Sequence, residues 1–165
     1  MEIVSRILEG SLLSGGAEPG RFFEGRVTQD DKIARLEEVA LLEACSHKQL
    51  RAVARITDVL ELPADTVLAR AGEPGNEFFL IVDGSARVEV SPRKRSRLGP
   101  GDYFGEMSLL DGGPRSATVV ADTPVRLLVI NRRDFTTLLR EAPGLTQNIL
   151  ITLSKRLRQS EAANR

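Results

Sequence analysis

One short segment of this chain, residues 104–119, contains side chains whose types and spacing can bind an oxyanion. Gly105 has no side chain, so the backbone there can approach a bound group closely. Residues 106–110 can form one helical turn, and the unpaired amide N–H groups at the start of a turn face an anion favourably. The segment therefore predicts a phosphate site built largely from backbone.

Three charged or polar side chains complete this predicted site. Arg115 is held between Pro114 and Ser116 and offers a planar fork of donors that can bind two phosphate oxygens, while Ser116 adds a hydroxyl donor. Glu106 would repel a bare phosphate, so it is suited to accept hydrogen bonds from neutral hydroxyls such as those of a ribose. We therefore expect phosphate and sugar to be bound by groups of opposite charge.

The segment resembles the phosphate-binding cassette of cyclic nucleotide-binding domains, which occur in regulatory subunits of protein kinase A, in cyclic nucleotide-gated channels and in the bacterial catabolite activator protein. The resemblance runs from about Cys45 to about Arg158 and includes the turn at residues 72–75, segment 78–84 and residues 100–102. It implies that the ligand is contacted by Gly105, Glu106, Met107, Ser108, Arg115, Ser116 and Ala117.

The resemblance also bears on the choice of ligand. In the family, threonine directly after the cassette arginine accompanies a preference for cyclic GMP, whereas serine occurs in bacterial members that bind cyclic AMP. Ser116 therefore favours cyclic AMP over cyclic GMP. The base is capped by the last helix or by a partner subunit, which leaves Arg156, Leu157 and Arg158 as candidates. We favour Arg156, because a guanidinium can stack on a purine.

After Thr57 the hydrophobic pattern takes the period of β-strands in short segments separated by Pro or Gly. These segments are 58–62, 66–69, 78–82, 86–90, 95–98, 117–121 and 126–130. Their spacing predicts a mainly β fold, and the resemblance implies an eight-stranded β-roll (jelly roll) with N-terminal helices and C-terminal lid helices. Asp83–Gly84 is expected to form a hairpin turn of a primed type, which requires positive φ.

Helical patterns lie on both sides of the strands. Residues 1–31 begin with an amphipathic pattern that predicts a short helix and a loop, and a further helix should start near residue 30. Ser46 is expected to cap another helix. Beyond the strands we expect helices over 134–141, ended by Pro143, and from 145 to about 159.

These patterns divide the chain into an N-terminal helical extension (1–44), a cyclic nucleotide-binding domain (45–160) and a short tail (161–165). The resemblance implies that ligand binding draws the cassette inward and lets the last helix close over the base. The charged residues Arg93, Lys94, Arg95 and Arg97 are expected to lie in an exposed loop.

Composition restricts the function classes further. The 165 residues are 41% hydrophobic and 28% charged, as in ordinary globular proteins, and no apolar run approaches the ~20 residues of a membrane span. The formal net charge is zero, which argues against nucleic-acid or membrane partners. The single cysteine, Cys45, forbids an internal disulfide and agrees with a cytoplasmic location.

The sequence thus predicts a non-enzymatic regulatory module that binds cyclic AMP, with no further cofactor or metal. Two alternatives stay open: a fold that no longer binds nucleotide and serves as an interaction module, and the sensor part of a regulator like the catabolite activator protein. The few residues after Gln159 are too short for a DNA-binding domain. A metal enzyme of the cupin class needs several histidines, and His47 is the only one. A protein effector and a homodimer are left open as partners.

Overall fold

The computed structural model describes residues 20–91 and 94–164, and these form two compact units. The first unit comprises the described residues up to Arg26 together with Thr57–Arg132, and the second comprises Val27–Ile56 together with the residues from Arg133 onward. The first unit contains all the described strands and is called the β unit below. The second contains most of the helices and is called the helical unit.

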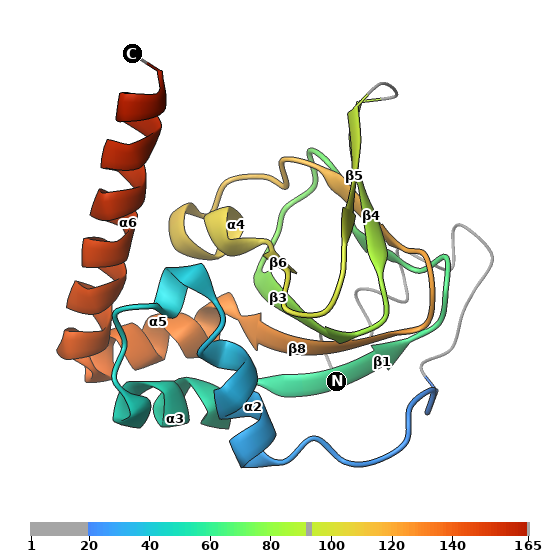
Figure 1. Cartoon of the computed structure of the whole chain (residues 1–165), viewed down its shortest axis with the longest axis horizontal. Helices are drawn as coiled ribbons and strands as arrows, with labels where there is room; N and C mark the ends of the chain where they lie inside the picture. The colour runs from blue at the N-terminus through green and yellow to red at the C-terminus, as the bar shows by residue number, and fades with distance from the viewer. Residues whose placement is uncertain (1–19, 92–93, 165) are drawn as a thin grey trace. The chain divides into compact units, whose positions relative to one another are not determined.

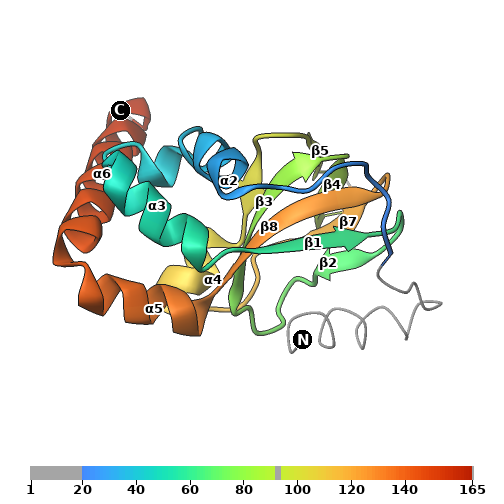
Figure 2. The same cartoon turned by 90° about the horizontal axis from the view of Figure 1, so that it is seen from below.

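The β unit consists of two four-stranded antiparallel sheets. The strands are β1 (Asp58–Leu62), β2 (Val67–Ala69), β3 (Glu77–Asp83), β4 (Ala86–Ser91), β5 (Lys94–Leu98), β6 (Tyr103–Phe104), β7 (Thr118–Ala121) and β8 (Val125–Asn131). One sheet has the order β1-β8-β3-β6 and the other the order β2-β7-β4-β5 (Figures 1 and 2). This confirms the predicted fold class, an eight-stranded mainly β roll with flanking helices. The two-residue strand β6 was not predicted.

The core of the β unit is formed by residues that both sheets contribute. Phe79 and Ile81 of β3 and Leu127 of β8 come from one sheet, and Val119 and Ala121 of β7 come from the other. All five are 3% exposed or less. Burial of such side chains stabilises the fold by about 1.5 to 3 kcal/mol each for the larger ones, so this cluster holds the two sheets together.

The turn after Asp83 does not form the predicted hairpin. Gly84 has a positive φ of 87°, as expected, but β3 pairs with β8 and β6 while β4 pairs with β7 and β5. Both edges of β3 are therefore occupied, and the turn carries the chain from one sheet to the other. A Cβ at residue 84 would collide with the carbonyl oxygen of Pro124, so this crossing requires glycine.

The predicted exposed loop around the basic cluster is also wrong in part. β5 begins at Lys94 and pairs with β4 up to Ser91, so most of the cluster belongs to a strand. The side chain of Arg97 is 82% exposed, and its Nε lies 3.6 Å from Asp122 Oδ2. Arg93 and the helix predicted near the N-terminus lie outside the described residues.

The helical unit begins with α2 (Gln29–Leu36), a 3-10 turn (Ala40–Leu42) and α3 (His47–Arg55). Thr28 caps α2 through a capping box with Asp31, and its hydrogen bonds to the carboxylate lower the pKa of Asp31. Ser46 caps α3 through the same motif with Gln49, as predicted. The helical segment that was predicted from residue 30 onward ends at Leu36 and is followed by the 3-10 turn at Ala40–Leu42.

Two further helices follow β8. They are α5 (Arg132–Glu141) and α6 (Pro143–Ala163), close to the predicted bounds. Pro143 lies in the first turn of α6, where its fixed φ is compatible with a helix. Within the helical unit, Asn148 on α6 donates a hydrogen bond of 2.8 Å to Gln49 on α3. No helix in the described part of the chain is long and apolar enough to span a membrane.

Candidate functional site

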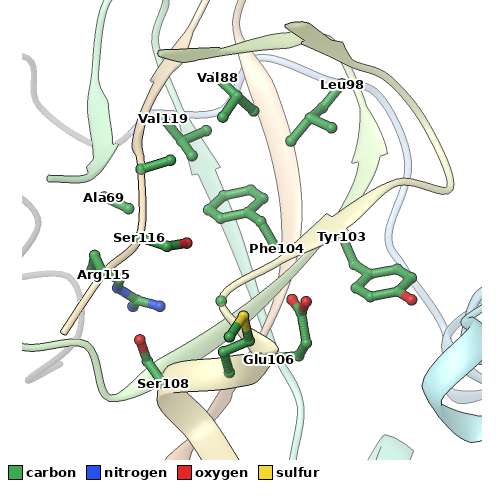
Figure 3. Close-up of a pocket in the computed structure, with 13 residues that line it drawn as sticks. Ala69, Val88, Leu98, Tyr103, Phe104, Glu106, Ser108, Arg115, Ser116 and Val119 are labelled. Atoms are coloured by element: carbon green, nitrogen blue, oxygen red, sulfur yellow. The ribbon is translucent and has the colours of Figure 1, made fainter. Parts of the chain in front are cut away.

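A pocket of about 180 Å³ opens in the β unit next to the segment singled out by sequence. Seven of the eight residues predicted to contact a ligand line it: Gly105, Glu106, Met107, Ser108, Arg115, Ser116 and Ala117. Figure 3 shows the polar side chains at one end of the pocket and a group of apolar side chains at the other. The fold thus brings together residues that are up to twelve positions apart in the sequence.

The predicted helical turn is the short helix α4 (Glu106–Asp111). Gly105 precedes it with a left-handed φ of 89°, and Gly112 ends it with a φ of 73°. Ser108 and Leu109 of this helix are buried, whereas Met107 is 61% exposed. The two glycines allow the backbone to enter and leave one turn of helix within a few residues.

Arg115 is the most constrained polar side chain of the pocket. It is only 7% exposed, and Nη1 donates a hydrogen bond of 2.9 Å to the carbonyl oxygen of Glu77. Nη2 donates one of 3.1 Å to Oε2 of the same residue, and the guanidinium carbon lies 5.6 Å from the centre of the Phe79 ring. The orientation of the guanidinium is therefore fixed before any ligand binds.

The backbone around Arg115 is fixed as well. Its N–H donates to the carbonyl oxygen of Glu73 at 2.9 Å, and its own carbonyl oxygen accepts from the N–H of Gly72 at 2.8 Å. A Cβ on Gly75 would collide with Nε of Arg115, and a Cβ on Gly105 would lie 2.6 Å from Nη1. Two glycines from separate loops thus leave the space in which the guanidinium lies.

The surroundings of Arg115 act on its pKa in opposite directions. Burial lowers the pKa of the guanidinium, and the charge and hydrogen bond of Glu77 act in the opposite direction, with a smaller contribution from Glu106. A guanidinium has five N–H donors, and within the described residues two of them form the bonds to Glu77. Donors therefore remain for an anion in the pocket.

Glu106 lies across the polar end of the pocket from Arg115. Its side chain is partly buried, and Figure 3 shows the carboxylate beside the pocket, with Ser108, Arg115 and Ser116 on the other side. A carboxylate accepts hydrogen bonds only, and Arg115 donates only. The two sides of this end can therefore bind hydroxyls and an oxyanion of one ligand at the same time.

The other end of the pocket is apolar. It is formed by Val88 on β4, Leu98 on β5, Val119 on β7 and the ring of Phe104, which stacks on Phe79 at 4.9 Å between centroids. Such a surface suits a flat, weakly polar group such as a heterocyclic base. These residues come from four different strands, β4, β5, β6 and β7.

Sequence reasoning missed several features of the site. Glu77 was not assigned a role, although a glutamate at the start of the apolar segment 78–82 is an unusual position for a charge. Gly75 was noted only as part of a turn. Arg156, the remaining predicted contact, belongs to α6 in the helical unit and its side chain is exposed, so its role stays a prediction.

No group of three or more potential metal ligands occurs among the residues that the structure places. The polar end of the pocket is lined by one buried cation, Arg115, and one acid, Glu106. A nucleotide-binding protein is the class that this fold and pocket define together.

Comparison with known proteins identifies the family. Residues 59–142 match the model of the cyclic nucleotide-binding domain, and this chain belongs to that family. It is 39% identical over 109 residues to a cyclic nucleotide-gated potassium channel of Mesorhizobium japonicum, which covers 66% of this chain and 30% of the channel. It is 36% identical over 122 residues to the cAMP-dependent protein kinase regulatory subunit of Emericella nidulans, covering 71% of this chain and 28% of that subunit.

A solved structure agrees with this assignment. The N-terminal domain of a transcriptional regulator from Streptomyces coelicolor superimposes with a TM-score of 0.71 and 28% identity, over 79% of this chain and 95% of that domain. The chain spans less than a third of the length of the two curated relatives. Its similarity to them therefore concerns the binding domain that they share with it.

Proposed function

We propose that this chain is a non-enzymatic receptor module for a cyclic nucleotide, preferably cyclic AMP. The observation that carries the proposal is the buried guanidinium of Arg115, which is held by Glu77 and keeps donors for an anion at the polar end of the pocket. The cyclic phosphate would bind Arg115 and the amide groups of α4, and Glu106 would accept from the ribose 2′-hydroxyl. The base would lie against Val88 and Leu98.

Ligand identity rests on two supports. Ser116 follows Arg115 and lines the pocket, as serine does in bacterial members that bind cyclic AMP. The fungal relative is named as a cAMP-dependent kinase regulatory subunit. Hydrogen bonds to charged groups contribute about 1.5 to 3 kcal/mol each, so a few of them with base packing give roughly micromolar affinity.

We infer that the output passes through the helices at the C-terminal end. Arg132 is the first residue of α5, and its Nη2 donates a hydrogen bond of 3.2 Å to the carbonyl oxygen of Ser108 on α4. Its backbone N–H donates to the carbonyl oxygen of Asn76 at 2.7 Å. A ligand that moves α4 would therefore act on the first turn of α5 directly. The last helix would then be repositioned over the base, with Arg156 as the stacking residue.

Calorimetric titration tests the binding proposal. We expect cyclic AMP to bind with roughly micromolar affinity and more tightly than cyclic GMP. Arg115→Ala should weaken binding about a hundredfold or more, because it removes a charged bidentate contact. Glu106→Ala should weaken it about tenfold.

The exposed Arg97→Ala is the matched control and should leave affinity unchanged. Undiminished affinity in Arg115→Ala would contradict the proposal. A wild-type protein that binds neither nucleotide would instead favour a fold that serves as an interaction module.

A further inference from the structure

Glu77 places a second acid at the phosphate end of the pocket, behind the arginine. Its side chain is 7% exposed, and Oε2 lies 3.1 Å from Nη2 of Arg115. The same carboxylate oxygen accepts a hydrogen bond from the N–H of Asn76. Because Glu77 lies at the start of β3, paired with Asn131 of β8, its backbone is held by the sheet. The carboxylate is therefore a fixed part of the site.

This acid changes the charge that a ligand meets. Glu77 and Glu106 contribute one negative charge each and Arg115 contributes one positive charge, so the three groups together carry a single negative charge. An anion bound to Arg115 shares one guanidinium with the Glu77 carboxylate and is its close neighbour. Like charges in such a poorly solvated place repel strongly, and the repulsion grows with the charge of the anion.

We propose that Glu77 makes the pocket select a singly charged phosphodiester over a doubly charged phosphomonoester. This inference rests on the proposed function, because it concerns the phosphate end of the same pocket. A cyclic nucleotide carries one negative charge on its phosphate, whereas a nucleoside 5′-monophosphate carries about −1.5 to −2 at neutral pH. Hydrolysis of the cyclic phosphate, which opens the ring to the monophosphate, would thus produce a molecule that Glu77 disfavours.

The test compares three ligands by calorimetry at neutral pH: cyclic AMP, 5′-AMP and the methyl ester of 5′-AMP. The last two share an open phosphate and differ by about one charge, so their comparison separates charge from ring closure. In the wild-type protein we expect the methyl ester to bind about tenfold or more tightly than 5′-AMP. Equal affinities for these two would overturn the proposal without any variant.

Glu77→Gln removes the charge and keeps an oxygen that can accept from Arg115. This substitution should tighten the binding of 5′-AMP more than the binding of cyclic AMP. The dissociation constant of 5′-AMP divided by that of cyclic AMP should therefore be about tenfold smaller than in the wild type. Glu77→Asp keeps the negative charge and should keep most of the preference for cyclic AMP over 5′-AMP.

The matched control is Glu61→Gln, which changes a partly buried acid that pairs with Arg126, away from the pocket. It should leave the ratio unchanged. An unchanged ratio in a folded Glu77→Gln protein would overturn this inference while leaving the proposed function intact. Failure of the wild type to bind cyclic AMP would instead count against the proposed function.

Discussion

Arg115 and Arg126 are both buried in the β unit, both paired with a glutamate and both placed over a phenylalanine ring. Their surroundings differ. Nε of Arg126 donates to Glu61 at 2.9 Å, and Nη2 donates to the carbonyl oxygen of Gly25 at 2.8 Å. Arg115 has Glu77 on one side and a pocket on the other.

The two buried arginines therefore have different roles. Around Arg126 the protein supplies the acceptors itself, including the carbonyl oxygen of Glu24 and the carboxylate of Asp83 at 3.6 Å. The arginine thereby fastens the segment that precedes the helical unit to β8. Around Arg115 the protein supplies a partner sufficient to orient the guanidinium and leaves room for a ligand. The first arginine should therefore control stability, and the second should control binding.

The largest expected effect comes from Arg126→Ala. The substitution removes the cationic partner of the partly buried Glu61 and the donor to the carbonyl oxygens of Glu24 and Gly25, which costs about 3 to 5 kcal/mol of unfolding free energy. Denaturant titration should show this loss. The fraction that remains folded should bind cyclic AMP as the wild type does, and a specific loss of affinity at unchanged stability would contradict the division of roles.

Arg115→Lys should give the converse result. Lysine keeps the positive charge near Glu77 but loses the planar fork, so we expect affinity for cyclic AMP to fall about ten- to a hundredfold. Calorimetry measures this change, with Arg126→Lys as the matched control at the other arginine. Equal losses of affinity in the two variants would show that the arginines are not distinguished by their surroundings.

Gly75→Ala probes the space around the guanidinium. A Cβ there would collide with Nε of Arg115, so the side chain must shift and affinity should fall about tenfold. Gly84→Ala is the control at the crossing between the sheets, where positive φ makes alanine costly by about 1 to 3 kcal/mol of stability. If Gly75→Ala leaves the affinity for cyclic AMP unchanged, the space around the guanidinium of Arg115 can accommodate an added methyl group, contrary to our account.

The smallest effect is expected at an ion pair that is partly exposed to solvent. Nε of Arg87 lies 3.1 Å from Oε1 of Glu89, with about a third of each side chain exposed. Glu89→Gln should change the unfolding free energy by no more than about 0.5 kcal/mol, because solvent screens such pairs. Thermal unfolding of Glu89→Gln and Arg126→Ala would compare their losses of stability. Similar losses in the two variants would mean that burial does not determine how much an ion pair contributes to stability.

Local patterns in the sequence predicted much of this structure. The strand segments, the cap at Ser46 and the helical turn after Gly105 each depend on residues within a few positions of one another. At the turn after Asp83, the positive φ of Gly84 was predicted correctly, whereas the hairpin connectivity was predicted wrongly. Which strands pair is decided by contacts across the sheets, and the residues at the turn carry no information about them.

The candidate site shows the same limit. The segment from Gly105 to Ala117 could be found because its residues are contiguous, and the structure collects them in one pocket. Glu77 lies 38 positions before Arg115, and the apolar wall comes from separate strands. Nothing in the local sequence links such residues, so the partner of the arginine became visible only once the register of the strands was known.

A crystal structure of the chain with cyclic AMP would test the central claim most directly. Our account predicts phosphate oxygens hydrogen-bonded to the donors of Arg115 that Glu77 does not use, with the Glu77 pair intact and Glu106 on the ribose. A nucleotide bound elsewhere, or a phosphate that makes no contact with Arg115, would contradict it.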